Sequence, residues 1–187
     1  MTRSVRAHGR RTANMAAPMS ASDPLPLDPI EMARDNWVKH GWGDSAHGMA
    51  LVTSIMRVQQ VFLARVEGIL RPFGLTFARY EVLRLLAFSR TGVMPVGKIG
   101  ERLQVHPASV TNAVQRLEAD GLVMRGANPN DGRSVLAAIT PDGRRLVDEC
   151  TDRLNAEVFA IVPIPLAQQE RTFKALKSVR KAFGDFA

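Results

Sequence analysis

The stretch RLQVHPASVTNAVQRLEADGLVMRGANPNDGRSVLAAITPDG, residues 102–143, decides the fold of this chain. Its first half contains Val110, Val114 and Leu117, which are spaced four and three positions apart. In a helix with 3.6 residues per turn these three side chains share one face. The pattern predicts a short helix that buries this face and exposes small polar residues on the other.

Signals for the ends of this helix, and for a β-hairpin after it, are also present. His106 is expected to be the N-cap, Pro107 the first helical residue and Gly121 the left-handed residue at the end. The segments LVMR (122–125) and SVLAAI (134–139) favour strands, and the eight residues between them, GANPNDGR, favour turns. We therefore predict a two-stranded hairpin with an eight-residue tip. Such a hairpin is marginally stable alone and needs a helical lobe to pack against.

The segment PVGKIGERL, residues 95–103, predicts another short helix, directly before the helix that starts at Pro107. Two short helices joined by a tight turn and followed by a β-hairpin form a winged helix-turn-helix. The expected fold class is therefore mainly α with a small β-hairpin wing (α+β). Helices from both termini are expected to flank this lobe.

Apolar periodicity and capping residues predict the helices that flank the lobe. They are expected at 30–40, from Asp44 or Ser45 to the RPFG at 71–74, from Thr76 to the SRTG at 89–92, from Thr140 to the VPIP at 162–165, and at 167–183. The domain organisation follows from these elements. We expect a disordered basic, Pro-rich tail at 1–29, N-terminal helices at 30–76, the winged helix-turn-helix at 77–140, and C-terminal helices at 141–187.

The composition excludes several classes of function. The net charge of +7 is spread along the 187 residues and so favours an anionic partner only weakly.

No stretch approaches the roughly 20 uninterrupted apolar residues of a membrane span, and the single cysteine, Cys150, excludes an intrachain disulfide. We expect a cytoplasmic protein with no membrane partner. The sequence has no phosphate-binding glycine loop, no HExxH, no CxxC and no metal-ligand spacing among its four histidines, so we expect no enzyme activity, no cofactor and no metal.

The exposed face of the predicted helix at 107–119 suits the major groove of DNA. A helix that enters this groove must be slim at its N-terminal end and must present hydrogen-bonding side chains to base edges. The alternative is an ordinary polar surface helix. The DNA-binding candidates on and before this helix are His106, Pro107, Ala108, Ser109, Thr111, Asn112, Gln115 and Arg116.

The tip of the predicted hairpin carries a second candidate contact. Arg133 follows the flexible Gly132 in a loop that needs no arginine for its turn, and an arginine beside a recognition helix suits the adjacent minor groove. Ser134, next to it, is included among the DNA-binding candidates. Asp131 is better explained as a brace for a neighbouring arginine or backbone N–H, because its carboxylate would repel phosphate. The alternative for Arg133 is a solvated surface side chain.

The pattern SVTNAVQRLEADGLVMR…NPNDGRSVLAAITPDGRRL resembles the MarR family of bacterial transcriptional regulators, most specifically at 109–146. The resemblance implies a winged-helix homodimer with the family's DPxDxR-like wing and LTxxG elements. In it, the helices at 30–76 and 141–187 interlock as the dimerisation region, and the winged helix-turn-helix at 77–140 is the DNA-binding domain. The resemblance places Ser109, Thr111, Asn112 and Gln115 at recognition-helix positions, Asp131 as the bracing acid and Arg133 at the wing tip. Two positions depart from the family pattern: Asn128 replaces the leading Asp of the wing motif, and Gly132 replaces a frequent arginine.

Dimerisation is also expected on physical grounds, because one small lobe cannot cover the apolar faces of all the long helices. A two-fold dimer on double-stranded DNA would bind a palindromic operator with half-sites one helical turn apart. The resemblance implies a repressor released by a small anionic or aromatic effector. Residues that could bind it are Trp37, Trp42, His47, Arg57, Arg79 and Tyr80, although the two tryptophans could instead anchor the first helix.

Two other functions remain open at this point. Cys150 could make the protein a redox-sensing regulator, as cysteines do in oxidation-responsive members of the family. Its apolar helix face and its neighbours Asp148 and Glu149 do not favour a thiolate, however. A winged helix could also serve only as a protein-docking module with no affinity for DNA. An RNA-binding role is disfavoured, because the proposed contact surface lacks stacking aromatic residues.

Overall fold

The computed structural model describes residues 25–186, which fall into two compact units, 25–57 and 58–186. The predicted tail therefore lies mostly outside the described residues. In the first unit, α1 (Pro29–Lys39) starts where the Asp28 carboxylate accepts a hydrogen bond from the Ile30 N–H at 2.9 Å. Gly41, with a φ of +85°, then separates α1 from the next helix.

Helix α2 (Gly43–Leu70) is long and mostly exposed, and the boundary between the units lies within it. Together with the 3₁₀ turn that follows it, this helix forms the segment Gly43–Phe73, which is long and apolar enough to cross a membrane. In its most apolar 18-residue stretch, 6% is buried inside the chain. Length and composition are weak evidence for such a span, because a helix that packs against a second chain shares them. Exposed apolar residues on α2 are Leu51, Val52, Met56, Val58, Val61 and Phe62.

In the second unit, three short helices form the helical lobe: α3 (Phe77–Phe88), α4 (Val96–Leu103) and α5 (Pro107–Ala119). As expected, Thr76 caps α3, its hydroxyl accepting a hydrogen bond from the Arg79 N–H. The turn between α4 and α5 is made by Gln104 in the left-handed region, with φ of 54°. Gly100 lets these two helices approach closely, because a Cβ there would lie 3.3 Å from Val110 Cγ2.

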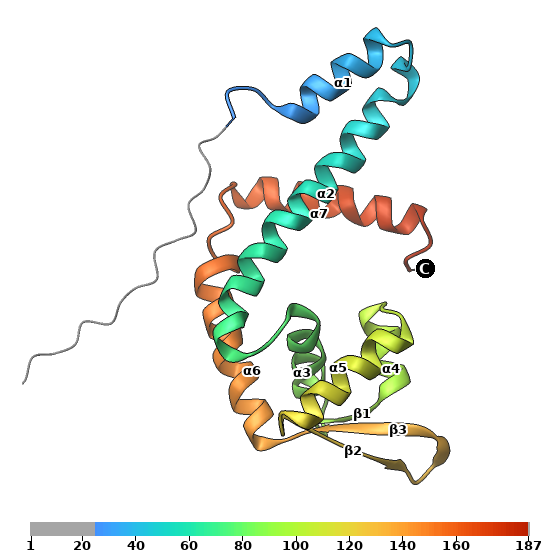
Figure 1. Cartoon of the computed structure of the whole chain (residues 1–187), viewed down its shortest axis with the longest axis vertical. Helices are drawn as coiled ribbons and strands as arrows, with labels where there is room; N and C mark the ends of the chain where they lie inside the picture. The colour runs from blue at the N-terminus through green and yellow to red at the C-terminus, as the bar shows by residue number, and fades with distance from the viewer. Residues whose placement is uncertain (1–24, 187) are drawn as a thin grey trace, which may run out of the picture. The chain divides into compact units, whose positions relative to one another are not determined.

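The sheet has three antiparallel strands in the order β1-β3-β2. Strand β1 (Val93–Pro95) pairs with β3 (Asp131–Ile139), which pairs with β2 (Val123–Asn128). The predicted eight-residue tip is wrong in length, because both strands continue to the Pro129-Asn130 turn, with a register shift at Ala127/Asn128. Figure 1 shows the β2–β3 hairpin extending away from the helical lobe. The short β1 was not predicted, since three residues carry too little pattern.

Helix α6 (Pro141–Leu154) begins at the end of β3 and continues into a π-helical turn, Asn155–Phe159. Helix α7 (Leu166–Ala182) follows the VPIP segment, as predicted. Thr140 is the expected N-cap of α6. Its hydroxyl accepts from the Gly143 N–H at 3.0 Å and donates to the Gly121 carbonyl at 2.9 Å. This one side chain therefore joins the start of α6 to the residue that follows the end of α5.

One hydrophobic core lies in the second unit and includes the residues on which the prediction of the lobe rests. Val110, Val114 and Leu117 are at most 1% exposed, as their spacing indicated. Helix α6 contributes its predicted apolar face to the same core. The largest fully buried side chains are Leu70, Leu83, Leu86, Ile99, Leu117, Leu154, Val82, Val110, Val114, Val123, Val147 and Cys150.

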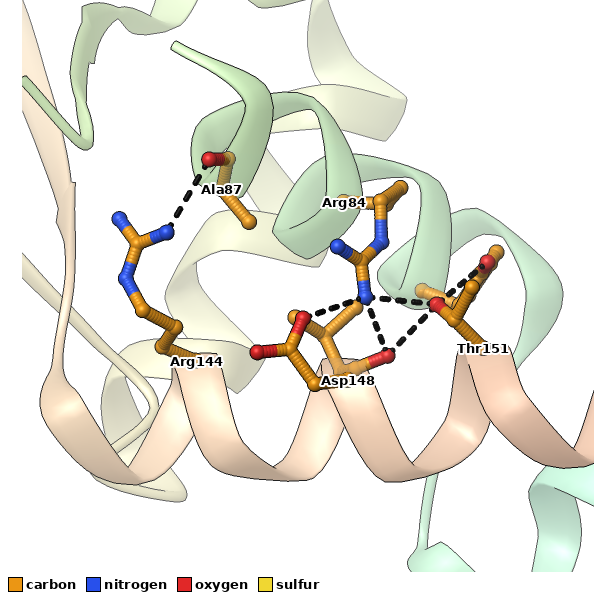
Figure 2. A network of polar contacts seen from close by, with 7 residues as sticks. Arg84, Ala87, Arg144, Asp148 and Thr151 are labelled. Carbon is orange, nitrogen blue, oxygen red and sulfur yellow. Dashed lines mark hydrogen bonds and ion pairs between the residues drawn. The ribbon is translucent and has the colours of Figure 1, made fainter. Parts of the chain in front are cut away.

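A network of polar contacts around Arg84 joins α3 to α6 (Figure 2). The Arg84 Nη2 donates to the Val147 carbonyl at 2.6 Å, to Asp148 Oδ1 at 2.8 Å and to Thr151 Oγ1 at 2.6 Å. Thr151 donates its own hydrogen to Val147, so Tyr80, 2.9 Å away, must donate to Thr151. Helix α6 is therefore joined to the helical lobe by side-chain hydrogen bonds as well as by packing.

Candidate nucleic-acid interface

Helix α5 has the construction expected of a recognition helix. The His106 Nδ1 accepts a hydrogen bond from the Ala108 N–H at 3.2 Å, and Pro107 is the first helical residue. Gly121, with φ of +71°, follows the end of the helix. Opposite the buried face, the candidates Ala108, Ser109, Thr111, Asn112, Gln115 and Arg116 are all exposed.

Three of these side chains, Thr111, Asn112 and Arg116, form hydrogen bonds within the helix. The Thr111 hydroxyl donates to the Pro107 carbonyl at 2.9 Å, so it presents an oxygen acceptor and a methyl group outward. The Arg116 Nε donates to Asn112 Oδ1 at 2.9 Å across one helical turn. The exposed face of α5 thus carries both acceptors and donors at defined positions, which is what readout of base edges requires.

Internal hydrogen bonds hold the wing in shape. Asn128 donates to Ser134 Oγ at 2.7 Å and accepts from the Asn130 N–H at 3.0 Å. Asp131 Oδ1 accepts from the backbone N–H of Arg133 at 3.0 Å, the kind of brace that the sequence suggested for it. Within residues 25–186, the Arg133 guanidinium has no hydrogen-bond or ion-pair partner, and it is exposed. Gly132 has open space around it.

A hollow of about 280 Å³ lies between the recognition helix and the wing. Thr111 contributes to it from α5, and Arg125, Arg133 and Ser134 contribute from the hairpin. Arg125 was missed as a candidate, although strand alternation could have found it. Val123 faces the core beneath α5, and the side chain two residues further along a strand lies on the same face. Arg125 Nε forms an ion pair with Glu118 at 2.6 Å, which links the wing to α5.

A second hollow, of about 480 Å³, lies beside α5 and is open to solvent. Arg79 lines it together with Ser109, Asn112 and Arg116. Arg79 Nη1 forms an ion pair with Asp120 at 2.9 Å, and Nη2 also donates to the Gly74 carbonyl. The structure therefore places Arg79, an effector candidate in the sequence analysis, next to the recognition helix.

The other effector candidates are divided between the two units. Trp37 packs edge-to-face on Trp42 in the first unit, with ring centroids 5.4 Å apart, and Trp42 also stacks with His40. This contact is what an anchoring role for the two tryptophans would produce. His47 is exposed on the first unit, where Arg57 also lies. Tyr80 belongs to the second unit, where it is 6% exposed and bonded to Thr151, so little of its ring is free for a ligand.

Cys150 is fully buried in the core of the second unit. Burial, with a smaller contribution from the Glu149 carboxylate, raises the pKa of its thiol to about 11. A thiol with that pKa is almost entirely protonated at neutral pH, and the thiolate is the reactive form. The structure therefore gives Cys150 a packing role and disfavours redox sensing. Among the described residues, no cluster of His, Cys, Asp and Glu could hold a metal ion.

The residues of the lobe and wing match a known family. The family model described as "MarR family" matches residues 75–135, from the start of α3 into the wing. Sco5413, a MarR family transcriptional regulator from Streptomyces coelicolor, is 48% identical, with a TM-score of 0.68. The match covers 74% of this chain and 96% of Sco5413. The chain belongs to the MarR family of transcriptional regulators.

Two other similar proteins have a named role or a bound ligand. The HTH-type transcriptional repressor Rv2887 of Mycobacterium tuberculosis is 29% identical over 122 residues, which cover 65% of this chain and 86% of the repressor. CouR from Rhodococcus jostii, whose structure holds p-coumaroyl-CoA, is 29% identical, with a TM-score of 0.59 and coverage of 69% of this chain and 90% of CouR. The MarR family comprises DNA-binding regulators, not enzymes, and the predicted family, winged-helix fold and regulatory class are confirmed.

Proposed function

We propose that this MarR-family chain is a repressor that binds an inverted-repeat operator as a homodimer. The observation that carries this proposal is that an exposed polar helix face and an arginine-bearing hairpin line one hollow. The exposed polar face of α5 lies across a hollow from a wing with a free arginine, Arg133. A recognition helix in the major groove and a wing arginine in the adjacent minor groove would together cover one half-site.

The apolar surface of the long helices supports the homodimer. In the second unit, α7 exposes Phe173 and Leu176, and Phe183 follows directly after it. On α2, Val58 and Val61 are also exposed. Soluble monomers rarely expose apolar areas of this extent, and a second copy of the chain would cover them. A C2 dimer places two recognition helices on one face of the duplex and so matches an operator with two-fold symmetry.

Repression and release by a ligand rest on the relatives. Rv2887 is named as a repressor, and the structure of CouR contains an aromatic CoA thioester, which is also an anion. We propose that an anionic or aromatic small molecule plays the corresponding role here. It would act only by binding one arrangement of the two DNA-binding lobes better than another. A cytoplasmic location follows from this proposal, because the operator is there.

The proposal is tested by titrating the full chain against the duplex upstream of its own coding sequence. Fluorescence anisotropy should show specific binding that exceeds binding to a scrambled duplex by about 10³-fold or more. The logarithm of the affinity should fall linearly with the logarithm of the salt concentration. A docking module would bind neither duplex at low ionic strength, and that result would overturn the proposal. Release of the bound duplex by p-coumaroyl-CoA or salicylate, used as probes, tests the effector class.

A further inference from the structure

Asn112 and Arg116 form a pair on the exposed face of the recognition helix. The Arg116 Nε donates to Asn112 Oδ1 at 2.9 Å. A guanidinium has only donors, so the amide atom that faces it must be the oxygen. This fixes the amide orientation and leaves Asn112 Nδ2 directed elsewhere. In the described part of the chain neither Asn112 Nδ2 nor the two Nη atoms of Arg116 has a hydrogen-bond partner.

The outward groups of this pair are therefore donors. Asn112 Nδ2 offers two N–H groups, and the guanidinium offers its remaining four beside a full positive charge. The Asn112 oxygen is already occupied on one side by Arg116. Of the neighbouring side chains on this face, Ala108, Ser109 and Thr111 are short and Gln115 is longer, so the α5 backbone can come closest to base edges at the N-terminal end of the helix.

The four base pairs differ in how well they match such a donor surface. In the major groove guanine presents two acceptors, N7 and O6, whereas adenine presents the N7 acceptor and the N6 amino donor. A free asparagine recognises adenine with both its oxygen and its nitrogen. When Asn112 is paired with Arg116, the adenine amino group would face the Arg116 guanidinium. Both groups are hydrogen-bond donors, so adenine is disfavoured.

We propose that the Asn112–Arg116 pair reads a guanine in the major groove of each half-site and that Arg116 turns Asn112 away from adenine. This inference rests on the proposed function, because α5 must lie in the major groove. Arg116 is then both a contact and a positioning residue for Asn112. Phosphate is also an acceptor, but the short side chains around the pair favour approach to the bases.

Selection of binding sites from a random duplex pool tests the proposal. Wild type should select a guanine at one position of each half-site. In Arg116→Ala the amide of Asn112 is free, so the same position should change to adenine or to a mixture of adenine and guanine. Arg145→Ala is the matched control, since Arg145 is exposed on α6 and removing it deletes one positive charge without touching α5. It should select the wild-type half-site.

Base analogues then separate a guanine contact from a phosphate contact. Replacing the selected guanine by 7-deazaguanine, which lacks the N7 acceptor, should weaken wild-type binding about 5- to 150-fold and Arg116→Ala binding much less. Neutral methylphosphonates at the flanking phosphates should weaken both proteins equally.

Two results would overturn this inference while leaving the proposed function intact. One is an Arg116→Ala variant that selects the wild-type half-site. The other is a pair of results: 7-deazaguanine does not weaken wild-type binding, and wild type binds the methylphosphonate duplex no more tightly than Arg116→Ala does. Together these results would show that the pair contacts phosphate and not guanine. A wild-type protein that enriches no duplex at low salt would overturn the proposed function and this inference together.

Discussion

Gly143 is required by a packing distance and not by its backbone angle. A Cβ atom at this position would lie 2.2 Å from the Leu122 carbonyl oxygen and 3.1 Å from Ile139 Cγ1. Both neighbours belong to the segments where the wing meets the helical lobe, and a backbone oxygen cannot move aside as a flexible side chain can. The glycine of the ITPDG segment therefore lets the first turn of α6 lie directly on the base of the wing.

We predict that Gly143→Ala lowers the free energy of unfolding by roughly 1–3 kcal/mol, the usual cost of overpacking a tight contact. Gly97→Ala is the control, because Gly97 is also helical but has no atom within 4 Å of an added Cβ. The control should be neutral or slightly stabilising, since alanine favours a helix over glycine. Denaturant midpoints at an unchanged slope measure both effects. Equal midpoints for the two variants would contradict the packing argument.

The buried thiol of Cys150 gives a prediction on pH. Its pKa is raised from 9.0 to about 11, so the native state holds this proton more tightly than the unfolded chain does. The resulting contribution to stability is complete below pH 9 and is lost as the pH rises toward 11. The stability difference between wild type and Cys150→Ala should therefore narrow over this range in denaturant titrations. Native protein at pH 7 should also react with a thiol reagent far more slowly than unfolded protein.

Several individual residues could be predicted from the sequence because their signals are local. The caps His106, Thr76 and Thr140 each precede a helix within hydrogen-bond reach of its first N–H groups, and short-range patterns report such contacts. Gln104 in the left-handed region could not be predicted, since glycine or asparagine is the usual residue there. The close contact of Gly143 with Leu122 depends on tertiary packing, to which no local pattern corresponds.

At the scale of elements, the contact between α3 and α6 joins helix α6 to the helical lobe of the second unit. Arg84 is the centre of this contact, and its Nε is buried without a hydrogen-bond partner among the described residues. The Arg84 guanidinium also lies over the exposed ring of Phe88, 5.1 Å from the ring centre. Arg144 adds a separate link, donating to the Ala87 carbonyl at the end of α3 at 3.1 Å (Figure 2).

We predict that Arg84→Met lowers the free energy of unfolding by about 1.5–3 kcal/mol. Methionine keeps much of the apolar stem but removes the charge-assisted hydrogen bonds to three acceptors on α6. Arg145→Met is the control, because its ion pair with Asp142 is exposed and such pairs contribute little. Thermal unfolding of both variants measures the difference. A loss for Arg84→Met no larger than for the control would show that packing alone holds α6.

The wing is the element whose existence could be predicted although its tip could not. The β-prone segments LVMR and SVLAAI indicated two strands, but the turn-forming residues between them suggested a long loop. In the structure, Asn128 and Asp131 form hydrogen bonds within the tip and extend the hairpin almost to Pro129. Side-chain bonds of this kind stabilise strand ends that the propensities of asparagine, aspartate and glycine disfavour.

We predict that Arg133→Ala lowers operator affinity by roughly 1–3 kcal/mol without changing the oligomeric state. The loss should be larger on operators with A·T-rich flanks, because a narrow minor groove concentrates negative potential. Arg145→Ala again controls for the loss of one positive charge. Anisotropy titrations on duplexes with A·T-rich and G·C-rich flanks measure the effect. An identical loss of affinity on both duplexes would show that Arg133 contacts the DNA backbone and not the minor groove.

At the scale of the whole molecule, several large apolar side chains are exposed and are not covered by any part of the described chain. The side chain of Phe173 on α7 is 61% exposed and that of Phe88 on α3 is 76% exposed. The two differ in context. Phe173 belongs to the long helices for which the amphipathic pattern indicated a dimer, whereas Phe88 is a single aromatic residue that packs on Arg84.

We predict that Phe173→Glu converts the protein from dimer to monomer, because a carboxylate would be buried without a partner in the proposed interface. Circular dichroism should show unchanged helix content, and operator affinity should fall by orders of magnitude, since a monomer contacts only one half-site. Phe88→Glu, a change of the same size outside the proposed interface, should leave the dimer and its operator binding intact. Sedimentation equilibrium decides the matter: a wild-type monomer, or a Phe173→Glu variant that still dimerises, would remove α7 from the interface.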